Sequence, residues 1–250
     1  MATEATVLTE RTLGGLKVEP VVESASFLNM LIYGDPGVGK TVLAGSAQAC
    51  PDLAPVVFID MEGGTLSLRK QYPNVEVVPV KSMDHMQRVY EELRRGNSGY
   101  KTVVLDSLTE IQKFSMYGIM DQVVKDNEDR DPDVPGLKEW AKNTEQIRKL
   151  VRAFRDLPMN TIFTALSAHD FEPSRTRPSL SAKLSSEVAG FVDIVVYMYI
   201  KIVGKERKRL LLSQGTGITI AKDRSGFLPE VIEHPTMADI YAYVYNNQTG

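Results

Sequence analysis

Gly34-Asp35-Pro36-Gly37-Val38-Gly39-Lys40-Thr41 is the stretch of sequence that decides the fold. It follows the apolar run Leu28–Tyr33 and precedes a helical segment, Val42–Ala49. A strand, a glycine-rich turn of this spacing and a helix form a phosphate-binding loop, because backbone N–H groups and the positive end of the helix surround phosphate oxygens. We therefore predict a nucleotide site in which this stretch holds the phosphates, the catalytic Lys40 reaches the β and γ oxygens, and Thr41 binds Mg²⁺.

A second buried strand supplies the expected partner of the metal ion. Val103-Val104-Leu105-Asp106 is an apolar run that ends in an acid. Such an aspartate can instead cap the segment that begins at Ser107, but beside a phosphate loop the magnesium role is favoured. ATP and Mg²⁺ are the expected cofactors, with Thr41 and Asp106 as metal ligands.

The base that activates water has to come from another strand, because the residue after Asp106 is a serine. Val56–Asp60 is a further apolar run, and it continues into Met61-Glu62-Gly63-Gly64. A carboxylate at this point lies at the C-terminal edge of the sheet, where open α/β folds bind their ligands. We assign Glu62 as the general base and Asp60 as a structural residue. The alternative is that one of the two acids only caps the glycine turn.

Short apolar runs alternate with amphipathic segments along most of the chain. This pattern predicts an α/β fold, with a mostly parallel sheet flanked by helices. Phe191–Ile200 and Arg209–Ser213 are joined by a turn at Gly204, as in a hairpin, so the C-terminal strands are expected to be antiparallel. The expected strands are Leu28–Tyr33, Val56–Asp60, Val75–Val80, Thr102–Asp106, Thr161–Leu166, Phe191–Ile200, Arg209–Ser213 and Ile218–Ala221.

Two sheet-covering helices are placed by the spacing of their apolar residues. The first is capped by Ser82 or Asp84 and ends at Gly96, and the second runs from about Leu137 to Leu157. Between the phosphate-site strands and the second helix, Lys125–Asp133 is acidic and is expected to be a loop.

The domain organisation follows from these elements. Residues 1–26 show no helical period, and we interpret them as an arm with one strand near Leu16–Val22 that could contact another subunit. Residues 27–250 form the expected ATPase domain.

Composition excludes several classes of protein. One cysteine, Cys50, rules out a disulfide framework, and the three histidines (His85, His169 and His234) are not spaced like metal ligands. The uncharged apolar run Ile194–Ile200 is far too short to cross a membrane, so a cytoplasmic protein without a membrane partner is expected. A net charge of −3 gives no support for nucleic-acid binding by bulk basicity, which makes any such binding depend on local basic patches.

The phosphate loop, the strand that ends at Glu62 and the strand that ends at Asp106 together resemble the RecA-like ATPase core. More narrowly, Asp60–Thr65 and Ala221–Pro229 resemble phage-encoded nucleotide-binding proteins that include RecA-like single-strand annealing proteins. The resemblance covers about residues 28–235 and implies a RecA-like P-loop NTPase core that hydrolyses ATP during DNA recombination. A phage-encoded protein would act in the cytoplasm of the infected bacterium.

The resemblance implies three further sets of residues. The strand Thr161–Leu166 leads to the γ-phosphate sensor, for which RecA-like proteins usually use glutamine and this chain offers Ser167 or His169. The segment Asp170–Gly190 corresponds to a DNA-contacting loop. Its candidate DNA-binding residues are Arg175, Arg177 and Lys183. Lys222 and Arg224 correspond to basic catalytic fingers that reach the nucleotide of a neighbouring subunit, so a homo-oligomer, as a ring or a filament, is implied.

A second basic cluster is evident from the sequence itself. The segment Lys201–Arg209 carries five basic residues and one acid. Cationic side chains can contact the phosphates of single-stranded DNA, although a solvated hairpin tip is an equally good interpretation of this segment. The candidate contacts in the cluster are Lys205, Arg207 and Lys208.

Three functions remain open at this point. The first is a DNA-stimulated ATPase of recombination or annealing, working with single-stranded DNA and with a single-strand DNA-binding protein as a further candidate partner. The second is a ring helicase motor, against which stands the absence of a recognisable extra domain. The third is a nucleotide-gated regulator or a small-molecule kinase that does not bind DNA, but no arginine-rich lid is evident.

Overall fold

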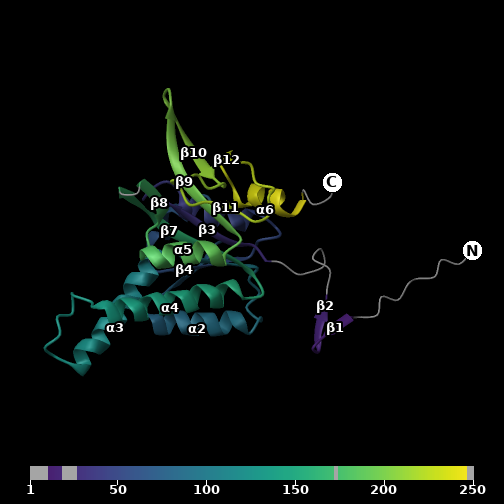
Figure 1. The fold of residues 1–250 in the computed structure, drawn as a ribbon. Helices are drawn as coiled ribbons and strands as arrows, with labels where there is room; N and C mark the ends of the chain where they lie inside the picture. The colour runs from purple at the N-terminus through teal and green to yellow at the C-terminus, as the bar shows by residue number, and fades with distance from the viewer. Residues whose placement is uncertain (1–10, 19–26, 172–173, 247–250) are drawn as a thin grey trace, which may run out of the picture.

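The computed structural model describes residues 11–18, 27–171 and 174–246. Across these residues ten strands form one sheet, whose main path runs β12-β10-β9-β3-β7-β6-β4-β5 (Figure 1). Pairing is parallel from β9 to β5 and antiparallel among β9, β10 and β12, which confirms the predicted fold class. The strands of the main path are β3 (Asn29–Gly34), β4 (Val56–Asp60), β5 (Glu76–Pro79), β6 (Thr102–Asp106), β7 (Asn160–Phe171), β9 (Ile194–Val203), β10 (Glu206–Leu212) and β12 (Val231–Glu233).

Helices cover both faces of the sheet. Alternate side chains of β3 enter two separate apolar cores, with Leu31 in one and Ile32 in the other. Figure 1 shows α2, α4 and α5 stacked along one face, and α6 lies on the other. The helices are α1 (Lys40–Gly45), α2 (Met83–Arg94), α3 (Leu108–Asp126), α4 (Leu137–Arg155), α5 (Ala182–Phe191) and α6 (Met237–Tyr245), with short 3₁₀ turns η1 (Ser46–Ala49) and η2 (Gly64–Leu68).

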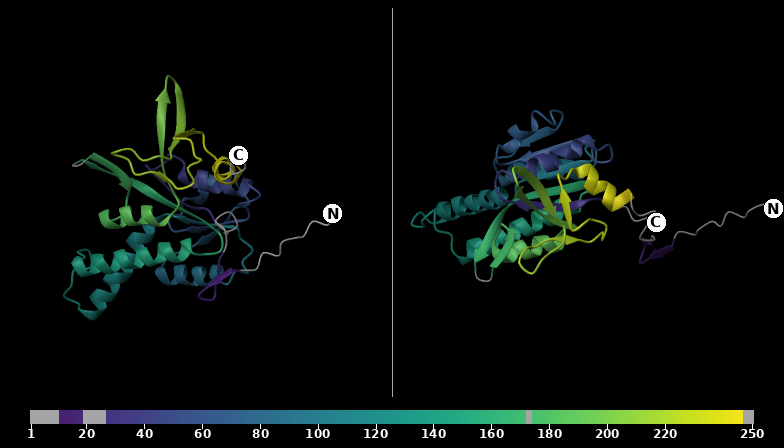
Figure 2. Two further views of the ribbon diagram at one scale, coloured as in Figure 1. Left: turned by 45° about the vertical axis from the view of Figure 1, so that its right-hand side comes forward. Right: turned by 90° about the horizontal axis from the view of Figure 1, so that it is seen from above.

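The two neighbours of β3 are longer than β3 itself. Gly34, its last residue, pairs with Leu166 of β7 and with Met198 of β9. Beyond this point β7 continues as a hairpin with β8 (Ser174–Pro178), and β9 continues as a hairpin with β10. The phosphate loop therefore leaves the sheet between two hairpins, which the left view of Figure 2 shows as separate arms.

Most predicted elements are present, and several predictions need correction. The expected strand Ile218–Ala221 is wrong: Thr219 forms only an isolated bridge, and the strand is β11 (Lys222–Asp223). The segment Asp170–Gly190 is not a loop, because it contains β8 and most of α5. The expected strand Phe191–Ile200 begins three residues later, since Phe191 still belongs to α5.

The predicted N-terminal arm falls partly on described residues. Instead of one strand it contains a hairpin, in which β1 (Arg11–Leu13) pairs with β2 (Leu16–Val18). Positive φ angles at Gly14 and Gly15 form its turn. The remainder of the arm, residues 1–10 and 19–26, lies outside the described residues.

Candidate functional site

Glycines shape the phosphate loop. A Cβ atom at Gly34 would overlap the carbonyl oxygen of Met198, so only glycine fits where the loop leaves β3. Gly37 and Gly39 have φ angles of 76° and 111°, which other residues rarely adopt. The ammonium of the buried Lys40 donates to the carbonyl oxygens of Gly34 (2.8 Å) and Asp35 (3.0 Å). Burial lowers its pKa.

The two predicted metal ligands meet beneath this loop. The Thr41 hydroxyl donates to Oδ2 of Asp106 at 2.8 Å, although the two residues lie on α1 and β6. The Thr164 hydroxyl, on β7, donates to Oδ1 of the same carboxylate. Burial is the main cause of the raised pKa of Asp106. Thr164 was not predicted, because a threonine within an apolar strand gives no local signal.

The donor set suits Mg²⁺. Hydroxyl and carboxylate oxygens are its usual protein ligands, and it commonly binds through one carboxylate together with substrate phosphates. Within the ranges that the structure describes, no group of three histidine, cysteine or acidic side chains could hold a metal ion without such help. Thr41 and Asp106 would therefore hold the ion jointly with the nucleotide.

Glu62 lies at the end of β4, next to β6. The Ser107 hydroxyl donates to its Oε1 atom. Burial raises the pKa of Glu62, and the bond from Ser107 opposes this rise. Asp60 accepts from the backbone N–H groups of Glu62 (3.1 Å) and Gly63 (2.8 Å), so its carboxylate holds the turn that presents Glu62. Glu62 is exposed on this turn.

The two sensor candidates lie over the phosphate loop on the first residues of the β7–β8 hairpin. Both contact Asp35: the Ser167 hydroxyl donates to its Oδ1 atom, and Nε2 of His169 lies 3.1 Å from the same oxygen. The hydrogen bond from Ser167 is the largest cause of the lowered pKa of Asp35. Both candidates therefore lie at the phosphate loop, where they contact Asp35, an acidic residue of the loop.

The two finger candidates lie at the end of the parallel strands that is opposite the phosphate loop. Asp223, between them, pairs with Ile194 at the start of β9, whereas the phosphate loop adjoins Met198. The Lys222 ammonium donates to the carbonyl oxygens of Ala189 and Val192, both at 2.6 Å. Arg224 donates to the Asp193 carboxylate at 2.8 Å. Neither reaches the site of its own chain, so a role in a neighbouring subunit stays a prediction.

The candidate DNA contacts fall into two groups. Arg177 forms two bonds with the Asp170 carboxylate and a third with the Leu180 carbonyl, so its guanidinium is engaged within the chain. Lys208 pairs with Glu233 at 3.0 Å. The exposed candidates are Arg175 on β8, Lys183 on α5, Lys205 at the tip of the β9–β10 hairpin and Arg207 near it.

A groove lies beside the phosphate loop. It has a volume of about 290 Å³ and borders Gly39 and the first turn of α1. Tyr72, Arg209 and His234 line it, and offer an aromatic ring, a cation and an imidazole. His234 has a φ angle of 48°, which is rare for a residue other than glycine and is often found at functional sites. No sequence pattern pointed to this groove.

The loop with its lysine, the threonine–aspartate pair and the adjoining glutamate define a P-loop ATPase. The chain belongs to the AAA domain family, whose model matches residues 26–225. No curated protein matches the chain. Solved structures that match include a KaiC-like protein from the hyperthermophilic archaeon Pyrococcus horikoshii, at 15% identity, covering 84% of this chain and 91% of that chain with a TM-score of 0.48.

Among the described helices, none is long and apolar enough to span a membrane.

Proposed function

We propose that this protein hydrolyses ATP on single-stranded DNA, as an oligomer in phage-type recombination or annealing. One observation carries the proposal. The phosphate loop, the Thr41–Asp106 pair and Glu62 converge at one edge of the sheet, between two hairpins that present exposed cations. Such a position suits a protein in which nucleotide and a polyanionic strand bind on adjacent surfaces.

The chain's own residues divide the hydrolysis between them. Lys40 exchanges its two carbonyl partners for phosphate oxygens of ATP and stabilises the charge that develops on the transferred group. Thr41 and Asp106 would hold Mg²⁺, which would supply positive charge beside the phosphates. Glu62 orients the attacking water and accepts its proton.

The proposed oligomer supplies the last group. Arg224 follows β11, which pairs with the start of β9, away from the phosphate loop of its own subunit. Its side chain is exposed, so it could reach a nucleotide bound to a neighbouring subunit. An arginine that arrives from a neighbour stabilises transition-state charge and contributes a rate factor of about 10³ or more. ATP would then lie between subunits, and DNA contacts would repeat from one subunit to the next.

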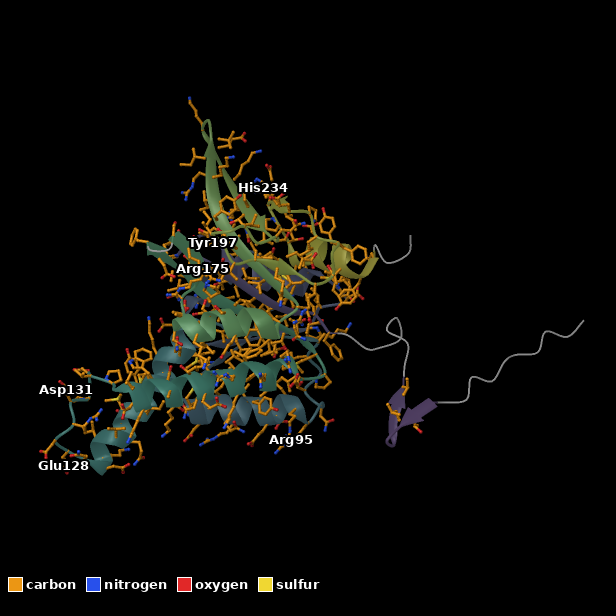
Figure 3. The ribbon with its side chains drawn as sticks, in the orientation of Figure 1. Arg95, Glu128, Asp131, Arg175, Tyr197 and His234 are labelled. Carbon is orange, nitrogen blue, oxygen red and sulfur yellow. The ribbon has the colours of Figure 1, made fainter. Side chains whose placement is uncertain are left out.

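Charge is distributed in the way that this proposal requires. Glu128 and Asp131 lie on the segment between α3 and α4, which Figure 3 shows at the far end of the molecule from Arg175 and His234. The net charge of −3 is therefore a sum over unlike regions. Repetition of the basic hairpins along an assembly would give a continuous positive track.

ATP hydrolysis measured with and without single-stranded DNA, together with particle size, tests the proposal. We expect turnover by an oligomer, stimulated by DNA. Turnover by a monomer that ignores DNA would contradict it and favour the regulator. A ring helicase motor is the second candidate, since it shares the same site. Unwinding of a tailed duplex would favour the motor, and pairing of complementary strands would favour annealing.

A further inference from the structure

Asp35 contacts three side chains beside the phosphate loop: Lys40, Ser167 and His169. Its carbonyl oxygen accepts from Lys40 at 3.0 Å. Its carboxylate accepts from the Ser167 hydroxyl and lies 3.1 Å from Nε2 of His169. These are the groups that a triphosphate in the loop would need. One acidic residue of the loop thus contacts all three side chains.

The carboxylate of Asp35 resembles a phosphate in charge and in the donors that it attracts. The His169 and Asp35 side chains are 49% and 53% exposed, so neither is fixed by burial and both can separate. An incoming γ-phosphate would bring negative charge close to Asp35 and would offer the same donors a stronger acceptor. The carboxylate and the triphosphate therefore compete for Ser167 and His169.

The contact also joins the loop to the β7–β8 hairpin. Nδ1 of His169 lies 3.1 Å from the Thr176 hydroxyl on β8. The backbone of Thr176 in turn bonds to Ile218 and Ile220, in the segment that leads to the finger residues. A move of His169 from Asp35 to a phosphate would therefore change the contacts at the base of the β7–β8 hairpin.

The geometry points to an autoinhibitory latch: Asp35 competes with ATP for Ser167 and His169, ties the β7–β8 hairpin to the phosphate loop, and releases it when nucleotide binds. The inference rests on the proposed ATP site, whose regulation it describes. Because binding and release are linked, anything that holds the hairpin away from Asp35 would also tighten ATP binding.

Calorimetric titration with Mg²⁺ and the non-hydrolysable β,γ-imido analogue of ATP tests the latch. Asp35→Asn and Asp35→Ala should bind the analogue about 1.5-fold to fivefold more tightly than the wild type, the range expected for the loss of an exposed contact to a carboxylate. Ser167→Ala should bind no more tightly than the wild type, because it loses a donor. Asp121→Asn is the matched control, since it removes the same charge from an exposed position of α3.

Hydrogen exchange provides a second measurement. Amides of β8 should exchange faster in the wild type when the analogue is bound, and equally fast in Asp35→Ala without it. Wild-type binding that Lys40→Ala abolishes, with no gain in the Asp35 variants, would overturn the latch and leave the ATP site intact. If neither the wild type nor the Asp35 variants bind, the latch and the ATP site both fail.

Discussion

The Ser107 hydroxyl donates a hydrogen bond to the Glu62 carboxylate, and so links the ends of two neighbouring strands. The contact orients one oxygen of Glu62. Ser107 is the residue that follows the magnesium aspartate, where it cannot itself be a base. In the proposed mechanism its hydroxyl positions Glu62, the proposed base.

Glu62→Gln should abolish turnover and keep ATP binding. The amide has nearly the shape of the carboxylate but cannot accept a proton, and a general base contributes a rate factor of about 10² to 10⁴. Steady-state hydrolysis and nucleotide titration check the two halves of the prediction. Asp60→Asn is the matched comparison, and turnover in Glu62→Gln above that in Asp60→Asn would show that Glu62 is not the base.

The acid limb of the turnover profile should lie above the pH at which an ordinary glutamate titrates. Protonated Glu62 cannot act as a base, so turnover falls as pH drops through its pKa, and burial raises that pKa above 4.5. The Ser107 bond lowers the pKa, so Ser107→Ala should move the limb to higher pH. A limb that stays in place, or moves to lower pH, would contradict this role of Ser107.

Thr164→Val should weaken the use of Mg²⁺. The variant removes the hydroxyl that bonds to Asp106 while keeping a side chain of similar size. Loss of a group that orients a metal ligand commonly costs about tenfold or more in metal affinity, so half-maximal turnover should require about ten times more Mg²⁺. Thr164→Ser retains the hydroxyl and should behave like the wild type. Equal Mg²⁺ requirements in both variants would exclude the role.

Arg224→Ala should lose turnover but keep nucleotide binding, and it should be rescued by mixing with Lys40→Ala. In a mixed oligomer, a Lys40→Ala subunit supplies an intact Arg224 to the site of an Arg224→Ala subunit. Asp193→Asn removes the ion pair of Arg224 but leaves the finger, so it should remain active. Mixtures that stay as inactive as their parts would show that Arg224 does not act across subunits.

The structure brings together the residues that short stretches of the sequence single out. The phosphate loop, Glu62 and Asp106 each end or follow an apolar run, and parallel strands bring such ends to one edge. The contacts of Asp35 with Ser167 and His169, and of Thr164 with Asp106, join residues far apart in the sequence. No local sequence pattern indicates these contacts, because each depends on the order of the strands in the sheet.

Helix α3 was not predicted from the sequence, for a similar physical reason. Its buried face includes Thr109, Gln112 and Ser115, so no continuous apolar stripe is visible in the sequence. Gln112 donates to Asn143 of α4 at 3.0 Å, and Asn143 donates in return to Ser115. Polar groups that satisfy one another across two helices replace the apolar contacts on which helical periodicity depends.

The tip of the β9–β10 hairpin should carry much of the DNA stimulation. Lys205 and Arg207 are exposed there, whereas Lys208 is paired with Glu233. Replacing the two exposed residues with alanine should weaken binding of single-stranded DNA and flatten its salt dependence by about 0.7 in log–log slope for each phosphate that is no longer neutralised. Anisotropy titrations with a labelled oligonucleotide at several salt concentrations measure both quantities.

The matched control for this hairpin is the double variant Lys142→Ala and Lys149→Ala, which removes two exposed cations from α4. That change lowers the total charge equally, so a purely long-range electrostatic effect would weaken DNA binding to the same extent in both double variants. Weaker binding confined to the Lys205 and Arg207 variant therefore indicates that the hairpin touches DNA phosphates. Equal weakening, or none, would mean that the tip is only a solvated turn and that DNA, if bound, lies elsewhere.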